Sequence, residues 1–456
     1  MPKRFVSALA PACLLLVAAC GGQPSRDGSA TPTTAAGSAA TDARIDPEIA
    51  AEVGRIKAID HHAHPMRLAT GDDRDTEYDA LPVDAMEPFP LPTRLRPENP
   101  EFIGAWKFLY GYQFDDRDEA HVKTLVEAKA RAMAEHGDGY PSWVLDRLGI
   151  ETMVTNRVAM GRGLTAPRFR WVPFADPLMY PLDNTRAKAR SADDGLFFES
   201  EERLLKRFLT ESDLTARPAS LDAYLAFVTK TLERHKAQGA IAEKFETAYL
   251  RLLDFAIVDR GEAAGIYARR AGVSEAEDKR LQDFLFRHIA SECGRLGLAV
   301  HIHVALGAGA SFRVAAANPL QLDPILNDRG LRQTRFVLVH GGFPMTREAA
   351  MLLIKPNVWL DFSAQTFLDS PEHLAGTLRE YLTMMPEKVM FGTDAFVIVP
   401  PIGWEELAWL SNDTARRALG MALTHMVRAG EVTKPRALDL ARMVLRDNAR
   451  ELYGWK

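Results

Sequence analysis

Residues 336–342 read FVLVHGG, four apolar residues followed by one histidine, His340, and two glycines. A short apolar run of this kind is typical of a strand that is buried on both faces of a parallel sheet. Residues 298–304 (LAVHIHV) and 389–395 (VMFGTDA) show the same pattern, an apolar run with a polar residue near its end, here His303 and Asp394. Burying a polar side chain without a partner costs several kcal/mol. We therefore expect these strand ends to meet around a shared partner, and a metal ion would satisfy all of them at once.

Working outward from these three runs, β-rich stretches alternate with amphipathic stretches along the chain. This alternation is typical of parallel βαβ units and predicts the α/β class. The predicted strands are residues 55–60, 151–158, 168–173, 239–245, 298–304, 335–340, 358–362 and 388–391. Eight strands of this kind predict a (β/α)₈ barrel, the TIM-barrel fold, formed by residues 45–456 as one domain.

Two connections are longer than a simple barrel needs. Residues 65–148 form a largely helical insertion after the first predicted strand, and residues 183–216 precede the fourth. Such insertions commonly extend the loops that cover the active face. The aromatic residues of 106–114 predict a helix that ends near Gly111. Whether these aromatic side chains form the core of the insertion or a wall of the substrate pocket is left open by the sequence.

The first predicted strand continues into residues 58–65, which read AIDHHAHP. Alternate residues of an extended chain share a face, so His62 and His64 should project together with Asp60 on the same side. The opposite parity of His61 predicts that it faces the helical layer or a loop. Two imidazoles spaced in this way can hold one divalent metal ion.

These motifs together resemble those of a known group of enzymes. They are DHHAH at 60–64, His303, HGG at 340–342, FGTDA at 391–395 and NARELY at 448–453. In order and spacing they resemble the amidohydrolase superfamily, and within it the amidohydrolase-related family that also includes metal-dependent decarboxylases. The resemblance covers roughly residues 50–456. It implies a barrel enzyme that binds one divalent ion, with zinc expected first and manganese or another divalent ion as alternatives.

The resemblance also assigns roles to residues of this chain. It implies that His62, His64, His303 and Asp394 bind the metal, and that Asp394 and His340 are the catalytic residues. His301 would bind substrate or support a metal ligand.

Three further side chains keep more than one interpretation. Lys244 is a surface residue, a substrate-binding cation or a carboxylated bridge between two metals, and Arg157 could bind a substrate carboxylate. Asp361 either orients a metal ligand or bonds a nearby backbone group.

A bound divalent cation lowers the pKa of its water to near 7 and polarises a nearby carbonyl. The preferred function is therefore hydrolysis of an amide, ester or lactone bond in a small-molecule substrate. The alternative is non-oxidative decarboxylation of an aromatic or enol carboxylic acid. A non-catalytic binding protein is disfavoured, because such a protein would be expected to lose some of the polar strand ends.

The N-terminus differs in composition from the rest of the chain. Lys3 and Arg4 precede an apolar stretch, and residues 16–20 read LVAAC. This pattern resembles a bacterial lipoprotein signal peptide at 1–20, with a lipobox and acylation of Cys20. Residues 21–44 are rich in Gly, Ser, Thr, Ala and Pro, which predicts a flexible tether. We expect a periplasm-facing lipoprotein, and Gly21 after the cysteine favours the outer membrane.

The overall charge excludes one class of partner. Over 456 residues the net charge is -5, and the basic residues are dispersed. The sequence therefore lacks the cluster of basic residues that is typical of nucleic-acid-binding proteins. The expected membrane contact is the lipid alone, and a homodimer is compatible with the sequence. Only Cys293 remains beyond the leader and lipobox cysteines, so no internal disulfide can form in the mature chain.

Overall fold

The computed structural model describes residues 42–69, 73–82, 85–270, 272–305 and 307–456. The predicted signal peptide, Cys20 and nearly all of the predicted tether lie outside these residues. Across the described part of the chain, no helix combines the length and the apolar character that a membrane span requires.

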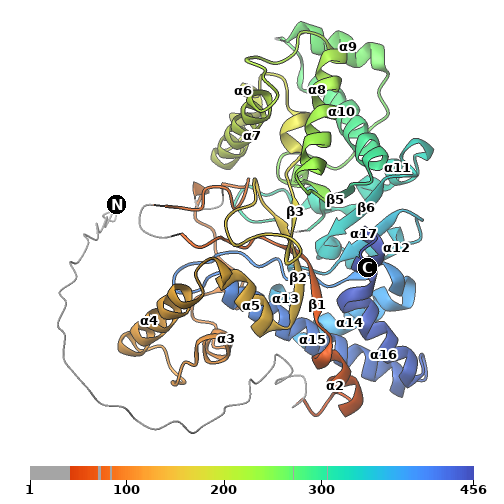
Figure 1. The fold of residues 1–456 in the computed structure, drawn as a ribbon. Helices are drawn as coiled ribbons and strands as arrows, with labels where there is room; N and C mark the ends of the chain where they lie inside the picture. Colours follow the sequence, from red (N-terminus) through yellow and green to blue (C-terminus); the bar gives the residue numbers. More distant parts are fainter. Residues whose placement is uncertain (1–41, 70–72, 83–84, 271, 306) are drawn as a thin grey trace, which may run out of the picture. The chain divides into compact units, whose positions relative to one another are not determined.

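Parallel strands and helices alternate along the described chain (Figure 1). The strands are β1 (Ala58–Ala63), β2 (Ile150–Asn156), β3 (Phe169–Val172), β4 (Ala242–Phe245), β5 (Ala299–His303), β6 (Arg335–Val339), β7 (Val358–Asp361) and β8 (Val389–Met390). They form two sheets, in the orders β1-β2-β3 and β4-β5-β6-β7-β8, and every neighbouring pair is parallel. The prediction of an α/β fold with parallel strands is confirmed.

Backbone hydrogen bonds also run between the two sheets. At one edge the N–H of Asp394, which follows β8, donates to the carbonyl of His62 in β1 at 2.7 Å. At the other edge the N–H of Lys244 in β4 donates to the carbonyl of Pro173, which follows β3, at 2.8 Å. The first and last strands therefore lie next to each other, and their polar carboxyl ends meet.

Helices connect successive strands. Between β1 and β2 lie α3 (Glu101–Tyr110), α4 (Glu119–His136) and α5 (Tyr140–Leu148); between β3 and β4 lie α6 (Thr185–Lys188), α7 (Ala192–Thr210) and α8 (Leu221–Ala237); α9 (Arg260–Arg269) and α10 (Glu275–Leu296) precede β5, and α11 (Asp323–Leu326) precedes β6. Further on lie α12 (Thr346–Leu352), α13 (Gln365–Leu368), α14 (Pro371–Met384), α15 (Trp404–Arg428), α16 (Lys434–Arg442) and α17 (Asn448–Tyr453). Helix α2 (Pro47–Arg55) precedes the first strand and includes residue 55, where that strand was predicted to begin. Strand β1 therefore starts three residues later than predicted.

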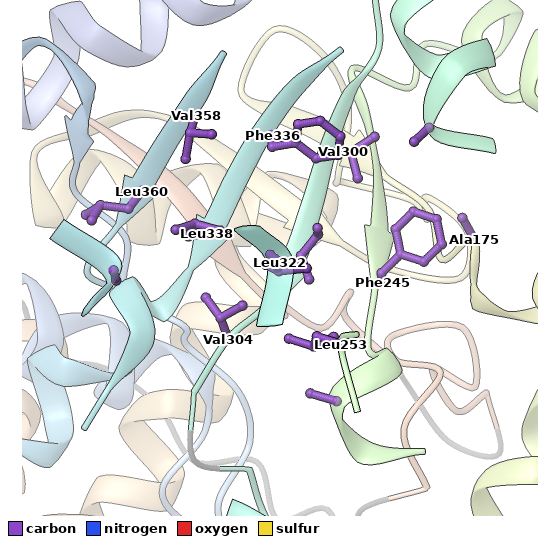
Figure 2. Packing of buried hydrophobic residues seen from close by; sticks show 14 of the residues in the cluster. Ala175, Phe245, Leu253, Val300, Val304, Leu322, Phe336, Leu338, Val358 and Leu360 are labelled. Atoms are coloured by element: carbon purple, nitrogen blue, oxygen red, sulfur yellow. The ribbon is translucent and has the colours of Figure 1, made fainter. Parts of the chain in front are cut away.

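The strands bury both faces, as their apolar sequences require. Figure 2 shows Val300, Phe336, Leu338, Val358 and Leu360 side by side on β5, β6 and β7, where they join the largest apolar cluster. That cluster includes residues of α8, α10 and α14, so this is the face that the helices cover. Val337 and Trp359, which alternate with these residues along β6 and β7, belong to a separate cluster on the opposite face. This second face contains the polar strand ends.

The segment between β1 and β2 packs its aromatic residues into apolar clusters. Helix α3 ends at Tyr110, and Gly111 adopts the left-handed conformation (φ 70°) that commonly ends a helix, so the predicted helix end is confirmed. Trp106 and Tyr112 are buried, with ring centroids 5.5 Å apart and nearly perpendicular planes. This packing favours the interpretation of these aromatic residues as structural core.

The C-terminal helical stretch, residues 434–453, is interrupted. Residues Met443–Asp447 form a π-helical turn between α16 and α17. A π-turn inserts an extra residue per turn, which shifts the apolar positions along the helix. This explains the irregular apolar spacing of that sequence.

Arg416 in α15 ties together three segments near the start of the sheet. Its guanidinium donates to the carbonyls of Val53, Ile56 (3.0 Å) and Gly149 (3.3 Å), and to the side chain of Asn412 (2.9 Å). Arg416 is almost completely buried, so water cannot replace these bonds.

We predict that Arg416→Met lowers the free energy of unfolding by about 2–5 kcal/mol, because it leaves buried carbonyl groups without donors. Denaturant unfolding monitored by circular dichroism is the measurement. The matched control is Arg417→Met, whose part-exposed guanidinium pairs with Asp42 and should contribute less than about 1 kcal/mol. Equal unfolding midpoints for the two variants would contradict the structural role of Arg416.

Candidate metal centre

Three polar side chains converge where β1, β6 and β8 end. Ligand atoms of His62, His340 and Asp394 all lie within 4.8 Å of one another. His62 Nε2 is 3.4 Å from Asp394 Oδ1, and His340 Nδ1 is 3.7 Å from Asp394 Oδ2. Distances of this size between donor atoms suit a shared cation of the kind that imidazole and carboxylate ligands bind.

His64 adjoins the same carboxylate. Its Nε2 is 3.5 Å from Asp394 Oδ1, and its ring centroid is 5.0 Å from that of His62. The other ring nitrogen, Nδ1, is 2.9 Å from Asp79 Oδ2. The two histidines of the first strand therefore approach Asp394 together.

His303 lies beside this group and is turned partly away from it. Its ring centroid is 4.7 Å from that of His340. However, its Nδ1 faces Glu246 Oε2 at 3.3 Å, and its Nε2 is 3.2 Å from the carbonyl of Ala305. Both ring nitrogens thus have protein neighbours, so His303 would have to rotate or exchange partners to bind an ion.

Asp60 stabilises the end of β1 rather than joining the cluster. Its carboxylate accepts hydrogen bonds from the N–H (2.8 Å) and hydroxyl (2.5 Å) of Thr393, and from the N–H of His62 (3.3 Å). Burial raises the pKa of Asp60 to about 7. The pairing of β1 with β2 changes register between Asp60 and Ala63, so strict alternation fails at this point.

His340 is positioned by the neighbouring end of β7. Asp361 Oδ1 accepts the backbone N–H of His340 (3.1 Å) and of Ser363 (3.0 Å), and also the Ser363 hydroxyl. Ser363 Oγ in turn lies 2.9 Å from His340 Nδ1. Asp361 therefore does both things that its sequence position suggested: it bonds backbone groups and orients a side chain of the cluster.

The backbone at the cluster adopts rare conformations. His340 and Asp394 have positive φ angles of 70° and 53°, which cost free energy for residues other than glycine. Gly341 and Gly342 continue the left-handed turn, and a Cβ on Gly342 would lie 2.7 Å from the side chain of Ala349. Strain of this kind persists where the surrounding structure holds a functional group in a required orientation.

Burial changes the ionisation of these groups. It raises the pKa of Asp394 to about 7, against the opposing charges of His64 and Lys244. Burial is also the main reason that the pKa values of His62 and His340 lie well below the ordinary value and that of His303 is about 4. Burial alone would lower the pKa of His64, but the charge of Asp79 outweighs it and raises that pKa.

His62 supplies the clearest sign that a cation fits. Its Nε2 is buried and has no hydrogen-bond partner among the described residues. A buried polar atom without a partner is costly, and it faces the Asp394 carboxylate. A neutral imidazole, as burial favours here, is the form that binds metal ions. The residues present therefore fit a divalent cation.

Lys244 is completely buried, so its interpretation as a surface residue is wrong. Its ammonium group pairs with Glu246 and lies 3.3 Å from Asn156 Oδ1. The positive charge of Lys244 also acts to lower the pKa values of His62 and Asp394.

Arg157 is buried, and four of its five N–H groups bond to the protein. Its guanidinium bonds both oxygens of Asp75 at 2.9 Å, and it also donates to the carbonyls of Pro65 and Ala159. Asp75 neutralises the charge of this group, so the geometry gives the predicted carboxylate contact little support.

The position of His61 differs from the prediction that it faces the helical layer or a loop. Its Nδ1 is 3.0 Å from Asp361 Oδ2, and its Nε2 is 2.8 Å from the hydroxyl of Tyr453 in α17. The same hydroxyl is 2.7 Å from His301 Nε2. His61 and His301 are thus neighbours on the polar side of the strands, where Ile59, two residues before His61, also packs.

Four contributing residues were missed by the sequence reasoning: Asp79, Glu246, Ser363 and Tyr453. Glu246 and Ser363 each lie two residues after a polar strand residue that was identified. Alternation along the extended chain could therefore have found them. Asp79 and Tyr453 carry no comparable local signal.

Comparisons with known proteins agree with the family resemblance of the sequence motifs. The model of a family described as "Amidohydrolase" matches residues 176–455. The protein fluG of Emericella nidulans is 28% identical over 201 residues, which are 42% of this chain and 22% of fluG. The chain thus spans about a fifth of the length of this curated relative.

Solved structures show the same fold at low sequence identity. Glucuronate isomerase of Caulobacter crescentus has a TM-score of 0.62 at 15% identity, with 91% of this chain and 96% of that chain covered. Uronate isomerase of Thermotoga maritima has a TM-score of 0.55 at 14% identity (90% and 98% covered). A protein of Lactobacillus casei described as a metal-dependent hydrolase has a TM-score of 0.54 at 16% identity (87% and 95% covered).

We predict one divalent ion per chain, lost on His62→Ala because that change removes the unpartnered Nε2. Elemental analysis of protein purified without chelator is the measurement. His121→Ala is the control, since His121 belongs to an exposed group with Asp116 and Asp118 that should contribute nothing. Two ions per chain, reduced by Lys244→Ala, would instead support a bridging role of Lys244.

Proposed function

The chain belongs to the amidohydrolase family, and on that premise we propose that it is a metal-dependent hydrolase of amide, ester or lactone bonds. One observation carries the proposal. The buried, unpartnered Nε2 of His62 faces a carboxylate, Asp394, that His64 and His340 also approach. That set of donors is suited to a divalent cation at the edge of a parallel sheet, where enzymes of this fold class build their sites.

We further infer that the two sheets form one closed (β/α)₈ barrel. The hydrogen bonds from Asp394 to His62 and from Lys244 to Pro173 support closure at both edges. In a closed barrel the carboxyl ends of all strands surround one site. The helices between β1 and β2 would then be an insertion on that side.

The proposed ligands are His62, His64 and Asp394, with His303 completing the set after its Nε2 leaves the carbonyl of Ala305. Zinc fits these nitrogen and oxygen donors best, and manganese is the alternative. A cation held there would supply an activated water and polarise the substrate carbonyl.

Asp394 is the residue placed to move the proton. Its side chain is 14% exposed, more than any histidine around it, so a small molecule can reach it. As a carboxylate it would accept the proton of the attacking water and return it to the leaving group as the bond breaks. Its positive φ angle holds the carboxylate toward the cluster.

His340 has a different role because its tautomer is constrained. The Ser363 hydroxyl donates to Asp361, so Ser363 Oγ accepts from His340 Nδ1–H. That leaves Nε2 of the neutral ring as a hydrogen-bond acceptor. His340 can therefore orient the attacking water, which this geometry favours over donation to a developing oxyanion.

The contacts of two cations favour hydrolysis over decarboxylation. In the decarboxylase alternative, Lys244 or Arg157 would bind the carboxylate of the substrate. Lys244 is paired with Glu246, and Arg157 with Asp75, so neither cation named by the sequence offers a free charge.

A screen of the metal-loaded protein against lactones, esters, amides and aromatic carboxylates tests the function. We predict hydrolysis, and a kcat for Asp394→Asn at least ~10²-fold lower, because the proton acceptor is lost while His62, His64 and His303 still hold the ion. Asp116→Asn, an exposed carboxylate, is the control. Carbon dioxide release from a carboxylate, with no hydrolysis, would support the decarboxylase instead. Near-normal turnover of Asp394→Asn would show that Asp394 does not transfer the proton, and would make His340 the leading candidate.

We also propose that Cys20 is acylated and anchors the enzyme on the periplasmic side of the outer membrane. The LVAAC sequence at 16–20 supports this proposal. Mass spectrometry of the mature chain should find an N-terminal lipidated cysteine, and Cys20→Ala should release the protein from membrane fractions. An unmodified N-terminus at another residue would contradict the anchor.

A further inference from the structure

We infer that Asp79 is a positioning residue for the metal centre, which fixes the ring orientation and the tautomer of His64. The inference rests on the proposed function, because it assumes that His64 binds the cation. Asp79 comes from the long segment between β1 and β2. It therefore connects that segment to the chemistry of the strand ends.

The contacts of Asp79 define its orientation completely. Oδ2 lies 2.9 Å from His64 Nδ1, and Oδ1 accepts the backbone N–H of Leu81 at 3.0 Å. The side chains of Asp79 and His64 are only 7% and 8% exposed. Water therefore competes weakly for this contact, and each carboxylate oxygen has its own protein partner.

The consequence for His64 follows from hydrogen-bond chemistry. A carboxylate oxygen 2.9 Å from Nδ1 favours the neutral tautomer of His64 that carries its ring proton on Nδ1. Nε2 then carries the lone pair, and it is the nitrogen that lies 3.5 Å from Asp394. A histidine that binds a metal through one nitrogen generally donates from the other to a carboxylate or carbonyl, which fixes the ring and increases its basicity.

The segment that carries Asp79 is itself fixed at the end of β2. Asp75 accepts two bonds from the buried guanidinium of Arg157, and Glu77 accepts the backbone N–H of Val158 at 3.0 Å. Asp75 and Glu77 lie four and two residues before Asp79. They hold its backbone in place and give Arg157 a structural purpose that the sequence did not reveal.

Zinc affinity of the full chain, measured by competition with a chromophoric chelator, tests the inference. We expect Asp79→Ala to weaken zinc binding by about 10–100-fold, since loss of such a partner typically has this effect. Asp79→Asn should lose less, because its amide oxygen can still accept from Nδ1–H. Asp79→Ala also removes the acceptor of the Leu81 N–H, so the comparison rests on Asp79→Asn, which keeps an acceptor and should leave the unfolding midpoint of the metal-free protein unchanged. Asp73→Asn, an exposed carboxylate of the same segment that pairs with Arg67, is the matched control.

Cobalt substitution separates positioning from direct ligation. If Asp79 only positions His64, the visible absorption bands of the cobalt protein should keep their wavelengths in Asp79→Ala. Wild-type zinc affinity in both Asp79 variants, or a changed cobalt spectrum, would overturn the inference. Absence of zinc binding by the wild-type chain would instead overturn the proposed function together with it.

Discussion

The buried carboxylate of Asp361 is the interaction on which the arrangement of the site depends. It bonds the backbone N–H groups of His340 and Ser363, the Ser363 hydroxyl and the imidazole of His61. A buried carboxylate is stable only when such partners are present, so each bond constrains the group at its other end. Through them Asp361 supports the left-handed turn at His340 and sets the tautomer of that ring. One residue of β7 thus fixes how β6 presents its histidine.

The same network extends across the strands to the end of the chain. His61 connects Asp361 to the hydroxyl of Tyr453 in α17, and His301 bonds that hydroxyl from β5. The last helix is therefore joined to the strands by polar bonds as well as by apolar packing. Buried polar networks of this kind specify one arrangement, because any alternative packing would leave several donors and acceptors without partners.

Local patterns predicted the strands and the polar ends, since both depend on residues that are neighbours in sequence. His62, His64 and Asp394 were identified in this way and lie together. The orientation of His61 was predicted wrongly, because the facing side of the strand was assigned from His62 and His64, whereas Ile59 and His61 also lie on that side. The contact of the buried Lys244 with Asn156 joins two distant segments, and no local pattern reports such a contact.

The central claim is that His62 and Asp394 hold a divalent cation. Anomalous diffraction from crystals of the zinc-loaded protein, recorded on both sides of the zinc edge, tests it most directly. The account predicts one strong peak per chain at about 2.0–2.2 Å from His62 Nε2 and from an Asp394 oxygen. No peak between these residues, or a peak confined to the exposed group at Asp116, Asp118 and His121, would contradict it.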